Sequence, residues 1–254
     1  MVCSKCQHEN TGGKFCGKCG NSLLADVTNE VAATSVPTHS AQQPNVHVEN
    51  AKKVTKMYFG YFMNILKSPY SQSKSIGTEH FINGLITVAL YALFIPLMVY
   101  LGLKDTIGIF HDSPFFTFVV KPSFGYAVFI MLVASYSFAA IKLGKVQVSY
   151  QAVIARFGSL LVPFVGMFGL ALLFAVLEIK FFVLILFIGF IGSIFTVPAL
   201  TISSFKKDTS SGLDVVYGTI LTYVATFITL GIMANILLEA IKNALEQWFG
   251  SFFF

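Results

Sequence analysis

Two long apolar runs, at residues 157–177 and 181–202, constrain this chain more than any other feature. Only Glu178, Ile179 and Lys180 separate them, which leaves room for no more than a tight hairpin. At a rise of about 1.5 Å per residue, each run is long enough to cross the roughly 30 Å hydrocarbon core of a bilayer as a helix. Neither run has the polar stripe that the exposed side of a soluble helix needs. The chain is therefore predicted to be an integral membrane protein.

The same criterion predicts an all-α membrane domain of five transmembrane helices at residues 81–238. Composition agrees, because 55% of the residues are hydrophobic and 11% are charged, against about 25% charged in an average soluble domain. The predicted spans are residues 81–102, 124–141, 157–177, 181–202 and 215–238. No Asp, Glu, Lys, Arg or His lies within these bounds, which argues against proton-coupled carriers, voltage sensors and intramembrane hydrolases.

Lysine and arginine placement predicts the orientation of the chain in the cell membrane. One side of the predicted spans is bordered by Lys67, Lys74, Lys142, Lys145, Arg156, Lys206 and Lys207. The other side is bordered by Lys104, Lys121, Lys180 and Lys242. The more basic side is expected in the cytoplasm together with the N-terminus, and five spans then place the C-terminus outside. The net charge of +5 is interpreted as contact with anionic headgroups.

All the cysteines lie near the N-terminus, as Cys3, Cys6, Cys16 and Cys19. Two Cys-x2-Cys turns joined by a spacer that contains Gly12 and Gly13 match the ligand spacing of a tetrahedral zinc site. We therefore predict a zinc ribbon of the β-hairpin type at residues 1–20, with zinc as a structural cofactor. Four thiolates leave no open position for catalysis, and with four cysteines present His8 is the weaker candidate ligand.

The thiolate pairs suit a reducing compartment, which agrees with a cytoplasmic N-terminus. Cys3 follows the initiator Met almost at once, without a charged or apolar leader, so no cleaved signal peptide is expected. Lysines 5, 14 and 18 are too few to favour a nucleic-acid-binding surface on the ribbon. A protein partner or sensing role is the preferred interpretation of this module.

Residues 21–50 are predicted to be a disordered linker, because prolines and scattered polar residues there show little apolar periodicity. Residues 51–68 are predicted to be an amphipathic helix. Its apolar face consists of Val54, Met57, Tyr58, Tyr61, Phe62, Ile65 and Leu66, and its polar face of Lys53, Lys56, Asn64 and Lys67. Two interpretations fit this pattern: an interfacial helix on the cytoplasmic leaflet, and a helix packed on a protein partner.

Polar and small residues in the spans allow two interpretations. Thr219, Thr222, Thr226 and Thr229 follow helical spacing along the last span. They could line a hydrophilic path, but packing against a neighbour is the commoner role of such residues. Pro96, Pro163 and Pro198 could mark discontinuous helices of a transporter, or only kink their helices. Close helix contacts are expected at Gly166 with Gly169, Gly189 with Gly192 and Ser193, and Gly218 with Thr222.

The C-terminal residues 239–254 are predicted to form a separate tail rich in aromatic side chains. These are Trp248, Phe249, Phe252, Phe253 and Phe254. Aromatic residues at this position are expected to anchor the tail at the outer membrane interface. Binding of a protein partner is the alternative interpretation.

Two stretches resemble known families. Residues 1–20, with Phe15 before the second cysteine pair and Gly20 after it, resemble the short zinc ribbons that begin many bacterial membrane proteins. Residues 143–151 (LGKVQVSYQ), 156–163 (RFGSLLVP) and 65–69 (ILKSP) resemble the bacterial Yip family. That resemblance implies five spans, a cytoplasmic N-terminus and a membrane component of undefined activity. The acidic motif linked to small GTPases in eukaryotic members has no counterpart in residues 1–60, so GTPase binding is not expected.

Together these features predict a non-enzymatic bacterial membrane protein that presents a cytosolic zinc ribbon to a protein partner, as an adaptor, scaffold or sensor. The alternative is a transporter or channel subunit. Its path would run near the Thr219 to Thr229 face and the kinks at Pro163 and Pro198.

Overall fold

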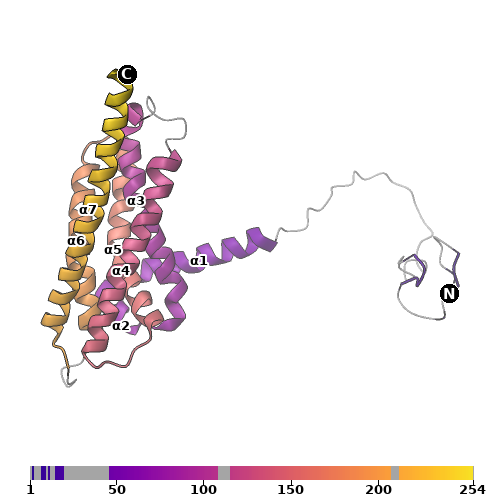
Figure 1. The fold of residues 1–254 in the computed structure, drawn as a ribbon. Helices are drawn as coiled ribbons and strands as arrows, with labels where there is room; N and C mark the ends of the chain where they lie inside the picture. Colours follow the sequence, from indigo (N-terminus) through magenta and orange to yellow (C-terminus); the bar gives the residue numbers. More distant parts are fainter. Residues whose placement is uncertain are drawn as a thin grey trace. The chain divides into compact units, whose positions relative to one another are not determined.

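A computed structural model describes residues 2, 7–9, 11, 15–19, 46–107, 115–206 and 212–253. The chain divides into two compact units, Met1–Val48 and Glu49–Phe254. The helices follow one another as α1 (Val46–Lys67), α2 (Pro69–Ser75), η1 (Thr78–His80), α3 (Phe81–Ile107), η2 (Phe116–Val120), α4 (Lys121–Leu143), α5 (Tyr150–Val176), α6 (Phe182–Phe205) and α7 (Val215–Phe253). In Figure 1, α3 to α7 stand side by side, and α1 crosses them.

The prediction of five membrane-spanning helices is confirmed. Among the described residues, five helices are long and apolar enough to cross a membrane. They are Thr78–Gly102, Phe116–Leu143, Tyr150–Val176, Phe182–Phe205 and Val215–Asn235. The chain is a multi-pass helical membrane protein, and its many exposed apolar side chains on α6 and α7 are the surface that such a protein presents to lipid.

The core of the bundle is built around α5. This helix buries residues along most of its length, including Phe157, Leu161 and Phe168, and it packs against α3 and α6. α3 and α5 approach backbone to backbone, because a Cβ on Gly158 would lie 2.5 Å from the Cα of Gly84. Glycine is therefore required on both helices at this crossing.

Of the predicted small-residue contacts, Gly189 is the tightest. A Cβ there would lie 2.5 Å from Cε1 of the Phe168 ring, so α6 approaches α5 over this glycine. Gly166 and Gly169 have looser surroundings, with nearest neighbours at 3.4 and 4.0 Å. The crossing of Gly84 and Gly158 was not among the predicted contacts.

α1 begins earlier than predicted, at Val46 within the expected linker. No proline lies between Pro44 and Pro69, so nothing in this stretch removes a backbone donor and the helix runs from Val46 to Lys67. The apolar face of α1 is buried at one end of the helix and exposed at the other. Tyr61 and Ile65 are buried against Ile76, Ala155 and Val162 of the same chain, whereas the more N-terminal Val54 and Met57 are exposed.

Three structural findings correct the predicted helix limits. α5 starts at Tyr150, so Arg156 lies inside a membrane-spanning helix, and the predicted absence of ionisable residues from the spans was wrong. The first span likewise includes Glu79 and His80, and the second includes Lys121 and Lys142. α7 also continues without a break through the predicted aromatic tail to Phe253.

Candidate functional site

The predicted zinc ligands lie in the N-terminal unit and are only partly described. Cys16 is buried, and Cys19 is exposed in the turn that follows it. Cys3 and Cys6 lie outside the described residues, so the geometry of a four-cysteine site is not defined. An isolated antiparallel bridge joins Val2 and Glu9. Among the residues of this unit that the structure describes, no three potential ligands come together.

A polar junction lies where α1 docks on the bundle. It consists of Tyr58 and Tyr61 from α1 and of His80, Asn83 and Thr87 from η1 and α3. The Tyr58 hydroxyl and Thr87 Oγ1 are hydrogen-bonded at 3.0 Å, and Thr87 in turn donates to the Asn83 carbonyl. The ring of Tyr61 lies 5.4 Å from the ring of His80. These contacts hold α1 to α3.

Burial at this α1 junction favours the neutral form of both tyrosines. Desolvation is the main cause that raises the pKa of Tyr61 well above its usual range, and the neighbouring Tyr58 adds to it. Desolvation also raises the pKa of Tyr58, and its hydrogen bond to Thr87 opposes this shift. The Tyr61 hydroxyl is buried and makes no hydrogen bond. The junction is therefore electrically neutral at α1 and holds the helix by packing and one hydrogen bond.

Arg156 connects three segments at the same end of the bundle. Its Nη1 donates to the Ser204 carbonyl on α6 at 2.9 Å, and its Nη2 donates to the carbonyls of Lys74 and Ile76 at 2.9 and 3.2 Å. The guanidinium also stacks 3.7 Å from the centre of the Phe205 ring. Since these carbonyls are left free at helix ends, Arg156 satisfies them and fixes the α2–η1 connection to α5 and α6.

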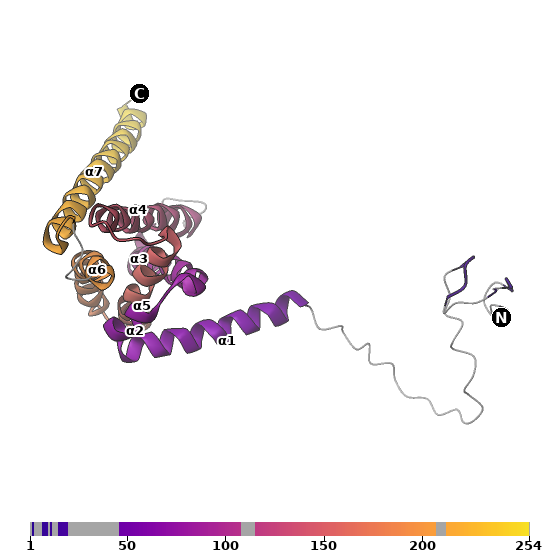
Figure 2. The same cartoon turned by 90° about the horizontal axis from the view of Figure 1, so that it is seen from below.

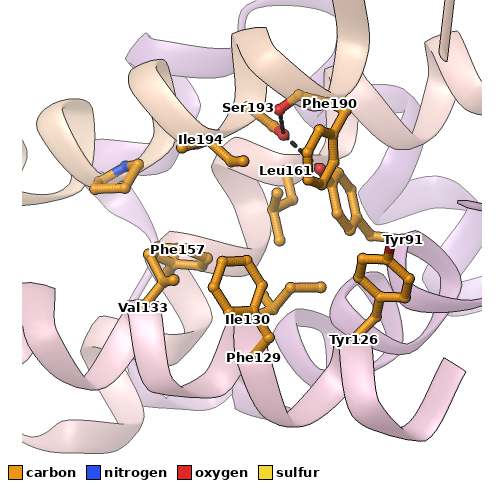
Figure 3. A pocket seen from close by; sticks show the side chains of 11 residues that line it. Tyr91, Tyr126, Phe129, Ile130, Val133, Phe157, Leu161, Phe190, Ser193 and Ile194 are labelled. Carbon is orange, nitrogen blue, oxygen red and sulfur yellow. Dashed lines mark hydrogen bonds between the residues drawn. The ribbon is translucent and has the colours of Figure 1, made fainter. Parts of the chain in front are cut away.

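Figure 3 shows a small cavity between α3, α4, α5 and α6, with a volume of about 20 Å³. Its walls are apolar apart from hydroxyl groups on Tyr91, Tyr126 and Ser193, of which Tyr91 and Ser193 are hydrogen-bonded to each other. Pro198 lines one side. A space of this size holds about one water molecule. The cavity is therefore too small to serve as a solute site in this conformation.

The threonine face of α7 is packed within the bundle. Thr222 and Thr226 are buried, and each of the four threonines donates its hydroxyl to the carbonyl four residues earlier. Thr229 also pairs with the Tyr136 hydroxyl on α4 at 2.8 Å. Pro163 and Pro198 lie inside α5 and α6, which continue on both sides of them. The threonines are therefore packed residues, and the two prolines do not interrupt their helices.

Sequence reasoning missed two of these features. Arg156 was placed at the border of a span, although Ser149 marks the true start of α5 by accepting a hydrogen bond from the Ala152 amide. A serine before a long helix is a recognised N-cap signal. Thr87 and His80 were not singled out, because nothing in the sequence shows which residues α1 will contact.

In the described part of the chain, the fold and these contacts define a helical membrane protein with five helices that can span a membrane and with α1 docked on α3 and α5. The chain belongs to the family of the uncharacterized protein YvbI of Bacillus subtilis (strain 168). The two are 31% identical over 229 residues, which is 90% of this chain and 92% of YvbI. No family model matches the chain, and no solved structure matches it. The Yip-family resemblance and the zinc ribbon therefore stay predictions.

Proposed function

We propose that this protein is a non-enzymatic membrane adaptor or sensor whose N-terminal cysteine module binds one structural zinc ion in the cytosol and engages a protein partner. The observation that carries the proposal is the Cys3-x2-Cys6-x9-Cys16-x2-Cys19 spacing. Two Cys-x2-Cys turns supply four thiolates, which is the donor set of a closed structural zinc site. In a module of about twenty residues, metal binding supplies most of the folding free energy, on the order of 10 kcal/mol.

The contacts in the membrane unit support an anchoring role. Arg156 donates to backbone carbonyls at helix ends, and the buried threonines of α7 donate to their own helix. The hydroxyls of Tyr91 and Ser193 pair with each other. Arg156 and the Tyr91–Ser193 pair thus join different helices, and the threonine hydroxyls are satisfied within α7, which fits a membrane anchor for the cysteine module.

The resemblance to the bacterial Yip family supports the same proposal. It implies a cytoplasmic N-terminus, which agrees with the excess of lysine and arginine on one side of the spans. It also places the cysteine module in a reducing compartment, where thiolates remain available to zinc.

Zinc content of the purified full chain tests the metal half of the proposal. We expect one zinc ion per wild-type chain and a loss of nearly all of it in the Cys16→Ser/Cys19→Ser variant, because two of four ligands are removed. Lys18→Ser is the matched control, since it alters the same turn and keeps the cysteines. Equal zinc content in wild type and the double serine variant would refute the metal site.

Affinity capture from membranes tests the partner half. Wild-type protein, Cys16→Ser/Cys19→Ser and Lys18→Ser are compared after equal amounts have been extracted. We expect a partner that is captured by wild type and Lys18→Ser and is lost from the double serine variant. Identical captured proteins from all three would show that the cysteine module does not recruit them.

A further inference from the structure

The surface of α1 divides into three faces rather than two. Tyr61 and Ile65 form the docking face and are only 8% and 1% exposed. On one side of them lies an apolar flank of Phe59, Met63 and Leu66, which are 63%, 39% and 39% exposed. Their spacing of four and three residues places them on one face of the helix. On the opposite side lies an exposed polar flank of Lys56, Gly60, Asn64 and Lys67.

The contacts of α1 show which flank lies deeper along the bundle. A Cβ on Gly166 of α5 would meet Leu66 Cδ1 at 3.4 Å and Phe62 Cζ at 3.8 Å. Gly166 lies about 24 Å along α5 from its start at Tyr150. In contrast, Tyr61 contacts His80, at the very beginning of the first span. The apolar flank, which includes Leu66, therefore faces the middle of the bundle, and the polar flank faces the end of the bundle.

The depth of α1 fits the boundary between headgroups and acyl chains. Its α5 neighbours Ala155 and Val162 lie about 8 and 18 Å from the start of α5. α5 has 27 residues, so it is about 40 Å long and extends about 5 Å beyond a 30 Å hydrocarbon core at each end. With α5 centred in this way, the axis of α1 lies roughly 8 Å inside that core, near its boundary, where in-plane amphipathic helices bury an apolar face by about 5–10 Å.

We propose that α1 is an in-plane membrane helix that binds anionic phospholipids. Phe59, Met63 and Leu66 contact the acyl chains, while Lys56 and Lys67 extend to the phosphate groups above them. The docking face fixes this rotation, because turning α1 would withdraw Tyr61 and Ile65 from the bundle. Figure 2 shows α1 continuing past the bundle. Val54 and Met57, which are exposed on the N-terminal side of the docking face, also meet lipid in this arrangement.

The charge of this surface favours an anionic lipid over a neutral one. Lys56 and Lys67 are exposed on the polar flank, and no described acidic side chain lies on α1 between Val54 and Lys67. Each lysine near an anionic leaflet strengthens the attraction of the helix to that leaflet by about fivefold. The proposal concerns the membrane unit and is independent of zinc binding by the cysteine module.

Tryptophan fluorescence in the full chain tests the orientation of α1. The single native tryptophan, Trp248, is replaced by Phe, and one new tryptophan is placed by Phe59→Trp or Met63→Trp, with Asn64→Trp as the matched control. The variants are reconstituted in vesicles of phosphatidylcholine with brominated acyl chains. We expect strong quenching by the brominated chains at positions 59 and 63, and quenching by aqueous acrylamide at position 64. Equal quenching at all three positions would overturn the proposal.

A second measurement separates lipid from other occupants. Brominated phosphatidylglycerol at low mole fraction is expected to quench Phe59→Trp more than brominated phosphatidylcholine does, and Lys56→Gln/Lys67→Gln is expected to abolish the difference. Quenching of Phe59→Trp that is the same with both lipids would refute the anionic preference. Protection of position 59 from both brominated lipid and acrylamide would overturn the proposal in favour of a second copy of the chain on this flank.

Discussion

Gly158→Ala perturbs a backbone-to-backbone contact between α3 and α5. The added Cβ would lie 2.5 Å from Gly84 Cα and 2.6 Å from the Gly84 carbonyl oxygen. Carbon atoms pack best at about 3.5–4.0 Å, so α3 and α5 must separate locally by about 1 Å. Both atoms belong to the backbone of α3, so no side-chain rotation relieves the contact.

The free energy of unfolding should fall by about 1–2 kcal/mol. Overpacking at a rigid contact costs about 1–3 kcal/mol, and replacing a helical glycine by alanine offsets up to about 1 kcal/mol of it. For a chain of this size, that loss lowers the melting temperature by about 2–4 °C per kcal/mol. The melting temperature is measured by thermal unfolding in one detergent, monitored with a fluorescent dye that does not react with thiols.

Gly125→Ala is the matched control for this experiment. Gly125 also lies in a membrane-spanning helix, but a Cβ there meets nothing within 4 Å. Its melting temperature should equal or exceed that of wild type. A Gly158→Ala protein as stable as Gly125→Ala would refute the backbone crossing of α3 and α5.

Other contacts carry shorter predictions. Arg156→Lys should lower the melting temperature and expose the α2–η1 connection to protease, because one ammonium group cannot reach the carbonyls of both Lys74 and Ser204; an unchanged cleavage rate would contradict this role. Tyr58→Phe, which removes the hydrogen bond to Thr87, should weaken α1 docking by about 0.5–1.5 kcal/mol, measured by protease cleavage within α1. Burial raises the pKa of Tyr58 and Tyr61, so α1 docking should be complete below about pH 10, the ordinary tyrosine value, and should be lost as the pH rises through the raised pKa values. The same cleavage assay at increasing pH checks this, and cleavage that does not change with pH would contradict it.

The span count could be predicted because bilayer thickness imposes a minimum length on every apolar run. Helix ends could not, because a helix continues through polar residues until a cap or a breaker stops it. α5 begins after the Ser149 cap, so it includes Arg156, which apolar content alone had left outside. α7 meets no proline before Phe253 and therefore continues through the predicted tail.

Helix contacts were predictable only as a class. Small residues at helical spacing indicate close packing, and Gly189 over Phe168 confirms that expectation. Which glycine meets which helix depends on the rotation and relative height of each helix, and neither quantity is encoded in hydrophobic periodicity. The pairing of Gly84 with Gly158 depends on the rotation and the height of α3 and α5, so it could be identified only from the structure.

α1 shows why a division into apolar and polar faces was insufficient. A helix docked on a membrane bundle has three surroundings, namely protein, acyl chains and the headgroup layer, and two of them select apolar side chains. Phe59 and Tyr61 are both aromatic, but their environments differ: Tyr61 is buried in the bundle, while Phe59 is exposed. Under the lipid-binding proposal their substitutions should separate. Tyr61→Ala should release α1 from the bundle, because it removes a buried ring, whereas Phe59→Ser should leave α1 docked, because most of the Phe59 side chain is exposed. Protease cleavage within α1 measures both, and equal cleavage of the two variants would contradict this division.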